Sequence, residues 1–110
     1  MINVVFERND DSTIHTFTMD GHAEFAEHGK DLVCAGASAV SIGAVNAINE
    51  ICGVRLEVEM NSVEGGFLRC RVPEKLESDT YEKVQLLLEG LFYSLKTIEE
   101  QYGQFIRIKS

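Results

Sequence analysis

One histidine and one cysteine, twelve residues apart, are the pair in this chain best suited to act together in a reaction. We expect Gly21-His22 to close a strand and Asp31 to open a helix that carries Cys34 in its first turn. The positive end of a helix dipole favours the thiolate form of a cysteine, and the free amides of the first turn could bind an oxyanion. We therefore predict that Cys34 is a catalytic nucleophile and that His22 is its general base.

Each of these two residues could instead have a different role. A cysteine inside an apolar helix is more often a buried small hydrophobic residue than a nucleophile. His22, His28 and Cys34 could instead bind zinc, but their spacing matches no standard zinc pattern, so we predict no metal. Cys52 and Cys70 form no C-x-x-C pair, and we interpret them as structural.

Three neighbouring residues could support the reaction. Asp31 is a typical N-cap residue, and orientation of His22 is a possible second role for its carboxylate. Ser38 follows Cys34 by one helical turn and could hydrogen-bond into the site, although such a serine more often bonds a backbone carbonyl. Gly21, directly before the histidine, can adopt a backbone conformation that other residues avoid.

The loop expected at residues 23–30 contains three candidate substrate contacts: Phe25, His28 and Gly29. Phe25 is its only large apolar residue. This composition is typical of a mobile lid over a cleft, although it is equally compatible with a short helical turn.

The remaining segments predict an α+β fold. Residues 2–8 and 13–19 are expected to pair as a hairpin, and residues 54–60 and 67–72 alternate as strands. Residues 31–51 predict a helix that is buried on much of its circumference, and residues 79–102 predict the strongest helix. With a last strand at 104–108, the order is ββαββαβ: one compact domain, residues 1–110, with two helices packed on a mostly antiparallel sheet.

The second predicted pair of strands has a clear polarity. Its apolar residues should point inward, whereas its acidic and basic residues should face one another on the outside. The inward set comprises Val54, Leu56, Val58 and Met60, and the outward set comprises Glu57, Glu59, Arg69 and Arg71.

Composition narrows the functional classes. The net charge of −8 disfavours direct binding of nucleic acid and would attract a basic peptide. Three cysteines argue against a disulfide framework. We expect no signal peptide, we expect the polar residues within 32–51 to exclude a membrane span, and we expect a cytoplasmic location.

The stretch from Gly21-His22-Ala23 through Glu27 to Val40 closely resembles the bacterial ribosomal-processing cysteine protease (Prp) family, and the similarity continues through Gly43 to Ile48, Glu64-Gly65-Gly66 and the last helix. The family pattern is Gly-His-Ala, then a glycine, then Asp-[Ile/Leu]-Val-Cys-Ala. The family often has Ile where Leu32 stands and Ala where Gly36 stands.

This resemblance implies a homodimeric cysteine endopeptidase without metal or organic cofactor. Its expected substrate is the N-terminal extension of a large-subunit ribosomal protein precursor, the protein numbered twenty-seven, cleaved after a short apolar-aromatic segment ending in Phe. By resemblance Cys34 is the nucleophile and His22 the base, with Asp31 and Ser38 near the site and residues 23–30 as the lid. A non-catalytic ribosome-assembly binding module of the same fold is the alternative.

Overall fold

The centre of the fold is a hairpin that continues into a five-stranded sheet. The computed structural model describes residues 1–21, 28–61 and 66–110. In it, β1 (Ile2–Arg8) pairs antiparallel with β2 (Ile14–Asp20). Phe6 lies opposite Phe17 in this pair, and their rings stack with centroids 5.6 Å apart. The alternate residues of β1 therefore point into the core, as the sequence predicted.

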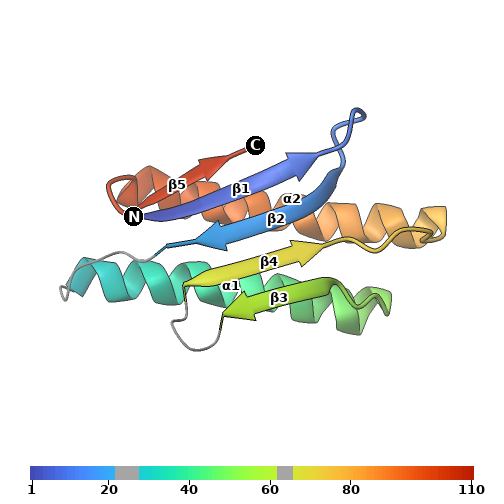
Figure 1. Cartoon of the computed structure of the whole chain (residues 1–110), viewed down its shortest axis with the longest axis horizontal. Coiled ribbons are helices and arrows are strands. Elements are labelled where there is room, and N and C mark those ends of the chain that lie inside the picture. The colour runs from blue at the N-terminus through green and yellow to red at the C-terminus, as the bar shows by residue number, and fades with distance from the viewer. Residues whose placement is uncertain (22–27, 62–65) are drawn as a thin grey trace.

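The other strands extend the hairpin on both sides. β4 (Phe67–Arg71) pairs with β2 and β3 (Glu57–Asn61) pairs with β4, both antiparallel, whereas β5 (Ile106–Lys109) runs parallel to β1. The sheet order is β3-β4-β2-β1-β5. The predicted α+β class, the ββαββαβ order and the mostly antiparallel sheet are confirmed (Figure 1).

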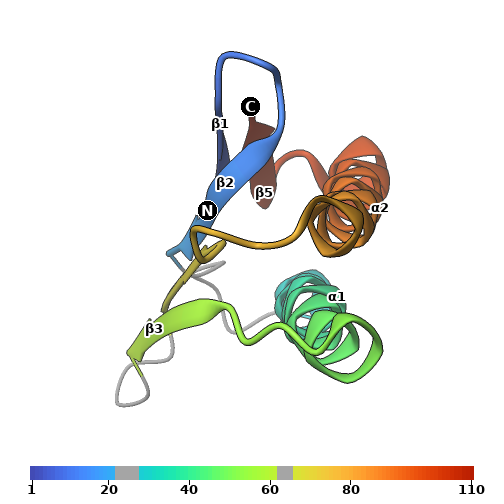
Figure 2. The same ribbon diagram turned by 90° about the vertical axis from the view of Figure 1, so that its right-hand side faces the viewer.

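Two long helices cover one face of this sheet (Figure 2). α2 (Ser78–Tyr102) buries the stripe that its periodicity predicted, with Val84, Leu88, Leu91 and Leu95 in the core. Its buried Gln85 behaves as an extra strand partner: the side chain accepts a hydrogen bond from the Ile14 N–H at 2.8 Å and donates one to the Ile14 carbonyl at 2.7 Å. This pair of bonds ties α2 to the start of β2.

The first helix differs from its prediction in two ways. α1 (His28–Cys52) begins three residues before Asp31, so the N-cap role predicted for Asp31 is wrong. Gly29 costs about 1 kcal/mol in a helix, which is too little to stop a long helix that packs on another. The helix is also not buried on much of its circumference. From Leu32 to Cys52, where its side chains are described, it buries a single stripe: Val33, Ala37, Ser41, Ala44 and Ile48.

The composition of α1 contradicts a further expectation. Leu32–Cys52 has a mean hydropathy of 1.5 and would be long and apolar enough to cross a membrane, judged by length and composition alone. The expectation that its polar residues exclude a span is therefore wrong on this measure. In the folded chain the apolar stripe of α1 packs in the core between the sheet and α2.

β3 is the edge strand of the sheet, and its apolar residues are more exposed than the sequence predicted. Val54 and Leu56, just before it, are buried as predicted. Val58 and Met60 were predicted inward but are 42% and 55% exposed. Among the described residues no strand lies beyond β3 in the sheet order, so these two side chains have no neighbouring strand on that side.

The outer face of β3 and β4 agrees with the sequence. Glu57 lies opposite Arg71 and Glu59 opposite Arg69, which confirms the predicted cross-strand pairs. The Glu59 carboxylate is 3.8 Å from the Arg69 guanidinium, and both groups are well exposed. Such a pair contributes little stability, but its polarity suits a sheet face without helices.

Candidate active site

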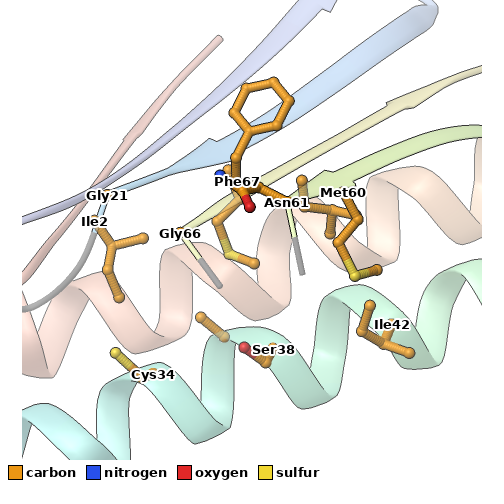
Figure 3. Close-up of a pocket in the computed structure, with 12 residues that line it drawn as sticks. Ile2, Gly21, Cys34, Ser38, Ile42, Met60, Asn61, Gly66 and Phe67 are labelled. Atoms are coloured by element: carbon orange, nitrogen blue, oxygen red, sulfur yellow. The ribbon is translucent and has the colours of Figure 1, made fainter. Parts of the chain in front are cut away.

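An apolar hollow of about 420 Å³ lies between α1 and the sheet, where β2 ends and β4 begins. α1 contributes Cys34, Ser38 and Ile42, which follow one another along the side of the helix that faces the strands (Figure 3). The opposite wall includes Met60 and Leu68. The hollow therefore places a thiol and a hydroxyl in surroundings that suit an apolar side chain.

The thiol of Cys34 reaches this hollow from the seventh residue of α1 and is half-buried. The expectation that Cys34 lies in the first turn is wrong, because α1 begins at His28. The backbone amides of Cys34, Ala35 and Gly36 lie beyond the first turn, where each donates to the carbonyl four residues earlier. They are therefore not free to bind an oxyanion, and the helix-end effect on the thiol is weaker than the sequence suggested.

Ser38 is brought together with Cys34, as their spacing of four residues predicted. It is exposed and lines the same hollow one turn further along α1 (Figure 3). A hydroxyl both donates and accepts hydrogen bonds, so Ser38 offers the hollow a polar group beside the thiol.

Gly21 lies at the end of β2 and has the unusual backbone conformation that was predicted for it. Its φ is +96°, and its N–H donates a hydrogen bond to the Gly66 carbonyl at 2.8 Å. A Cβ atom at this position would collide with the carbonyl oxygen of Met1. The chain is thus held between two neighbouring segments directly before His22.

Several candidates fall wholly or partly outside the described residues. His22 and Phe25 lie outside them, as does most of the expected lid. His28, Gly29 and Lys30 belong to α1 instead of a loop, which shortens the expected lid at its C-terminal end. The side chains of His28 and Asp31 lie outside the described part of the chain as well.

The other two cysteines contrast with Cys34. All three thiols are free. Cys70 in β4 is 1% exposed, and burial raises the pKa of its thiol to about 12. Cys52 is half-buried at the last residue of α1, away from the hollow. Across residues 1–21, 28–61 and 66–110, no three His, Cys, Asp or Glu side chains are grouped so that they could hold a metal ion.

Sequence reasoning missed the apolar residues that shape the hollow. Ile42 follows Cys34 and Ser38 at intervals of four residues, so that helical periodicity alone could have placed it on their face. Met60 gave no such signal. Its alternation with charged neighbours predicts a core residue, and only the edge position of β3 shows that it lines an open cleft.

A half-buried cysteine presented from a helix into an apolar hollow of a small α+β domain fits a cysteine hydrolase whose cleft accepts an apolar segment. The chain belongs to the family described as Cysteine protease Prp, whose sequence model matches residues 1–107. It is accordingly a cysteine protease.

Relatives with assigned names agree over nearly the full length. The Ribosomal processing cysteine protease Prp of Bacillus subtilis strain 168 is 44% identical over 108 residues, which cover 98% of this chain and 96% of the relative. The protein of the same name from Staphylococcus aureus strain Mu50 is 39% identical, with 98% and 97% covered.

A solved structure of a Prp protein has the same fold as this chain. The crystal structure of an essential ribosomal processing protease Prp from S. aureus, in complex with a substrate peptide, has a TM-score of 0.86 and 37% sequence identity. The match covers the whole of both chains. The fold described above is therefore the fold of this family.

Proposed function

We propose that this protease removes the N-terminal extension of the precursor of large-subunit ribosomal protein number twenty-seven, with Cys34 as nucleophile and His22 as general base. The observation that carries this proposal is the half-buried thiol of Cys34 at an apolar hollow. Gly21, the residue directly before His22 in the sequence, lines the same hollow. The names of the relatives support ribosomal processing as the biological role.

The reaction follows from these groups. His22 takes the proton of the Cys34 thiol, and the thiolate attacks the carbonyl carbon of the scissile peptide bond. The tetrahedral intermediate collapses as His22 returns the proton to the leaving amine, and an acyl-enzyme remains. Water, deprotonated by His22, then attacks the thioester and releases the new carboxylate and the free thiol.

Ser38 and Asp31 have supporting roles in this proposal. Ser38 lines the same hollow as Cys34 and would donate a hydrogen bond to the reacting carbonyl oxygen, a role that the α1 amides cannot fill. Asp31 would orient His22, since its capping role is lost. Phe25, His28 and Gly29 remain candidate substrate contacts.

The substrate preference follows from the walls of the hollow. Ile42, Met60 and Leu68 would surround an apolar or aromatic side chain next to the cleaved bond. The net charge of −8 would attract a basic segment elsewhere in the precursor. A relative of the same fold has been crystallised with a substrate peptide, which supports a peptide as partner.

We further propose that the enzyme is a homodimer, as the family resemblance implies, and that it acts in the cytoplasm, as expected from its sequence. Leu86 and Tyr93 are 73% and 65% exposed on α2 and lie seven residues apart, so they share one face of the helix, where we place the contact between the two copies. Sedimentation of the purified chain at micromolar concentration tests the dimer, and a monomer mass would contradict it.

Incubation of the full chain with the extended precursor tests the central proposal. Cleavage should vanish in Cys34→Ala and His22→Ala and persist in Cys52→Ala, which removes another half-buried thiol of the same helix. Ser38→Ala should lower kcat with little change in KM. An intact precursor after incubation with a folded wild type, or binding without cleavage, would favour the non-catalytic binding module and overturn the protease mechanism.

A further inference from the structure

A second hollow opens farther along α1, on the same side as the hollow at Cys34. It has a volume of about 320 Å³. Its helical wall is formed by Val45, Asn46 and Asn49, and the facing wall by Arg55, Leu56 and Val58. None of these six residues belongs to the first hollow, and the mechanism proposed above uses none of them.

The two hollows lie one after the other along α1 and the segment that leads into β3. On α1, Cys34, Ser38 and Ile42 line the first hollow, and Val45 and Asn49 continue the same helical face at intervals of three and four residues. On the opposite wall, Met60 lines the first hollow and Val58 and Leu56 the second. Val58 and Met60 alternate along β3 and therefore share one face of the strand, and Leu56 lies just before it.

We call this pair of hollows the α1–β3 trough; its first hollow is mostly apolar, and its second combines apolar side chains with Asn46, Asn49 and Arg55. Ile42, Val58 and Met60 are 37%, 42% and 55% exposed, although each lies on the side of its element that faces the trough. β3 is the edge strand, so the trough is not closed by a further strand. An extended chain lying there would bury these three side chains together.

The length of the trough suits a peptide. α1 rises about 22 Å from Cys34 to Asn49 at 1.5 Å per residue. A fully extended chain advances about 3.3 Å per residue, so this distance corresponds to six or seven residues. A peptide bond at Cys34 therefore puts a residue of the same chain at the second hollow.

We propose that the substrate polypeptide lies extended along the α1–β3 trough, and that a residue six or seven positions from the cleaved bond occupies the second hollow. The inference rests on the proposed function, because it takes Cys34 as the point of cleavage. Val58 and Leu56 would contact apolar atoms of that residue. The amides of Asn46 and Asn49 and the donor-only Arg55 would bind carbonyl or carboxylate oxygens.

Peptides of graded length test this inference. Two series from the precursor are used, one lengthened from three to eight residues on the amino side of the cleaved bond and the other on the carboxyl side. With the wild type, kcat/KM should rise at least tenfold in one series between five and seven residues. Val58→Glu should lower the ratio of kcat/KM for the long peptide to that for the short peptide at least fivefold.

Val5→Glu is the matched control, because Val5 is also a strand valine, is 37% exposed and lies on the outer face of the sheet. It should keep the wild-type ratio. Equal kcat/KM for long and short peptides, or an unchanged ratio in Val58→Glu, would overturn the trough as a substrate site while leaving the protease proposal intact. Cleavage of no peptide by the wild type would overturn both.

A second copy of the chain is the competing occupant of the trough. If Val58→Glu converts a dimer into a monomer in sedimentation and leaves the length dependence unchanged, the trough is an interface between copies and the inference is wrong. A loss of length dependence without a change in mass supports the substrate.

Discussion

Replacement of Gly21 by alanine should destabilise the fold far more than a typical glycine substitution. Gly21 has a φ of +96°, and conformations of this kind cost a non-glycine residue about 1–2 kcal/mol. A Cβ atom would also collide with the Met1 carbonyl oxygen, which is backbone and cannot rotate away as a side chain can. Relief of the collision requires the start of β1 or the end of β2 to move.

That movement would weaken the hydrogen bond from the Gly21 N–H to the Gly66 carbonyl, which contributes about 1 kcal/mol. The conformational cost, the collision and the weakened bond together predict a loss of about 2–4 kcal/mol in the free energy of unfolding. The same shift would displace His22, so that activity at a temperature where the variant is folded should fall as well.

Alanine substitutions at two other glycines separate the conformational cost from the cost of the collision. Gly53 has a φ of +67° with open space around its Cβ position, so Gly53→Ala should cost about 1–2 kcal/mol from conformation alone. Gly43 lies inside α1 and also has open space, so Gly43→Ala should stabilise the chain by about 1 kcal/mol. Urea unfolding followed by circular dichroism measures all three. Equal midpoints for Gly21→Ala and Gly53→Ala would refute the argument from the collision.

Two further predictions concern the core. The pKa of the Cys70 thiol is raised to about 12 from 9.0, so the unfolded chain loses this proton first and stability should fall as the pH rises above 9. Urea midpoints between pH 8 and 10.5 should show this decline in the wild type and a smaller one in Cys70→Val, and parallel curves would contradict it. Gln85→Leu should lose about 2–5 kcal/mol, because it leaves the N–H and the carbonyl of Ile14 buried without their partner. An unchanged urea midpoint would contradict this.

Local patterns in the sequence were enough for most of the fold. The apolar period of α2 placed Val84 and Leu88 in the core, because a helix covered on one side needs one apolar stripe. The alternation of β3 and β4 placed the acidic residues of one strand opposite the arginines of the other, because a hairpin register is set by nearby residues. In both cases the information lies within a few residues of the element it describes.

The wrong predictions concern which other elements pack against a given strand or helix. Alternation shows that Val58 and Met60 share a face of β3, but it does not show whether another element covers that face. Coverage depends on the position of β3 in the sheet order, which brings together segments far apart in the chain. The start of α1 was missed for a related reason: packing on α2 sustains helical structure through Gly29, whose own propensity opposes it.

These errors and the proposed substrate site involve the same residues. Val58 and Met60 have the pattern of core residues, yet the free chain leaves both of them partly exposed along the trough that begins at Cys34. These residues alternate as core residues do, yet no other described element buries them fully. Such conflicts between local sequence and global structure concentrate at functional sites. The proposed apolar segment of the substrate would resolve the conflict, because it would cover these side chains in the trough. Substrate binding would then account for an exposure that does not stabilise the free chain.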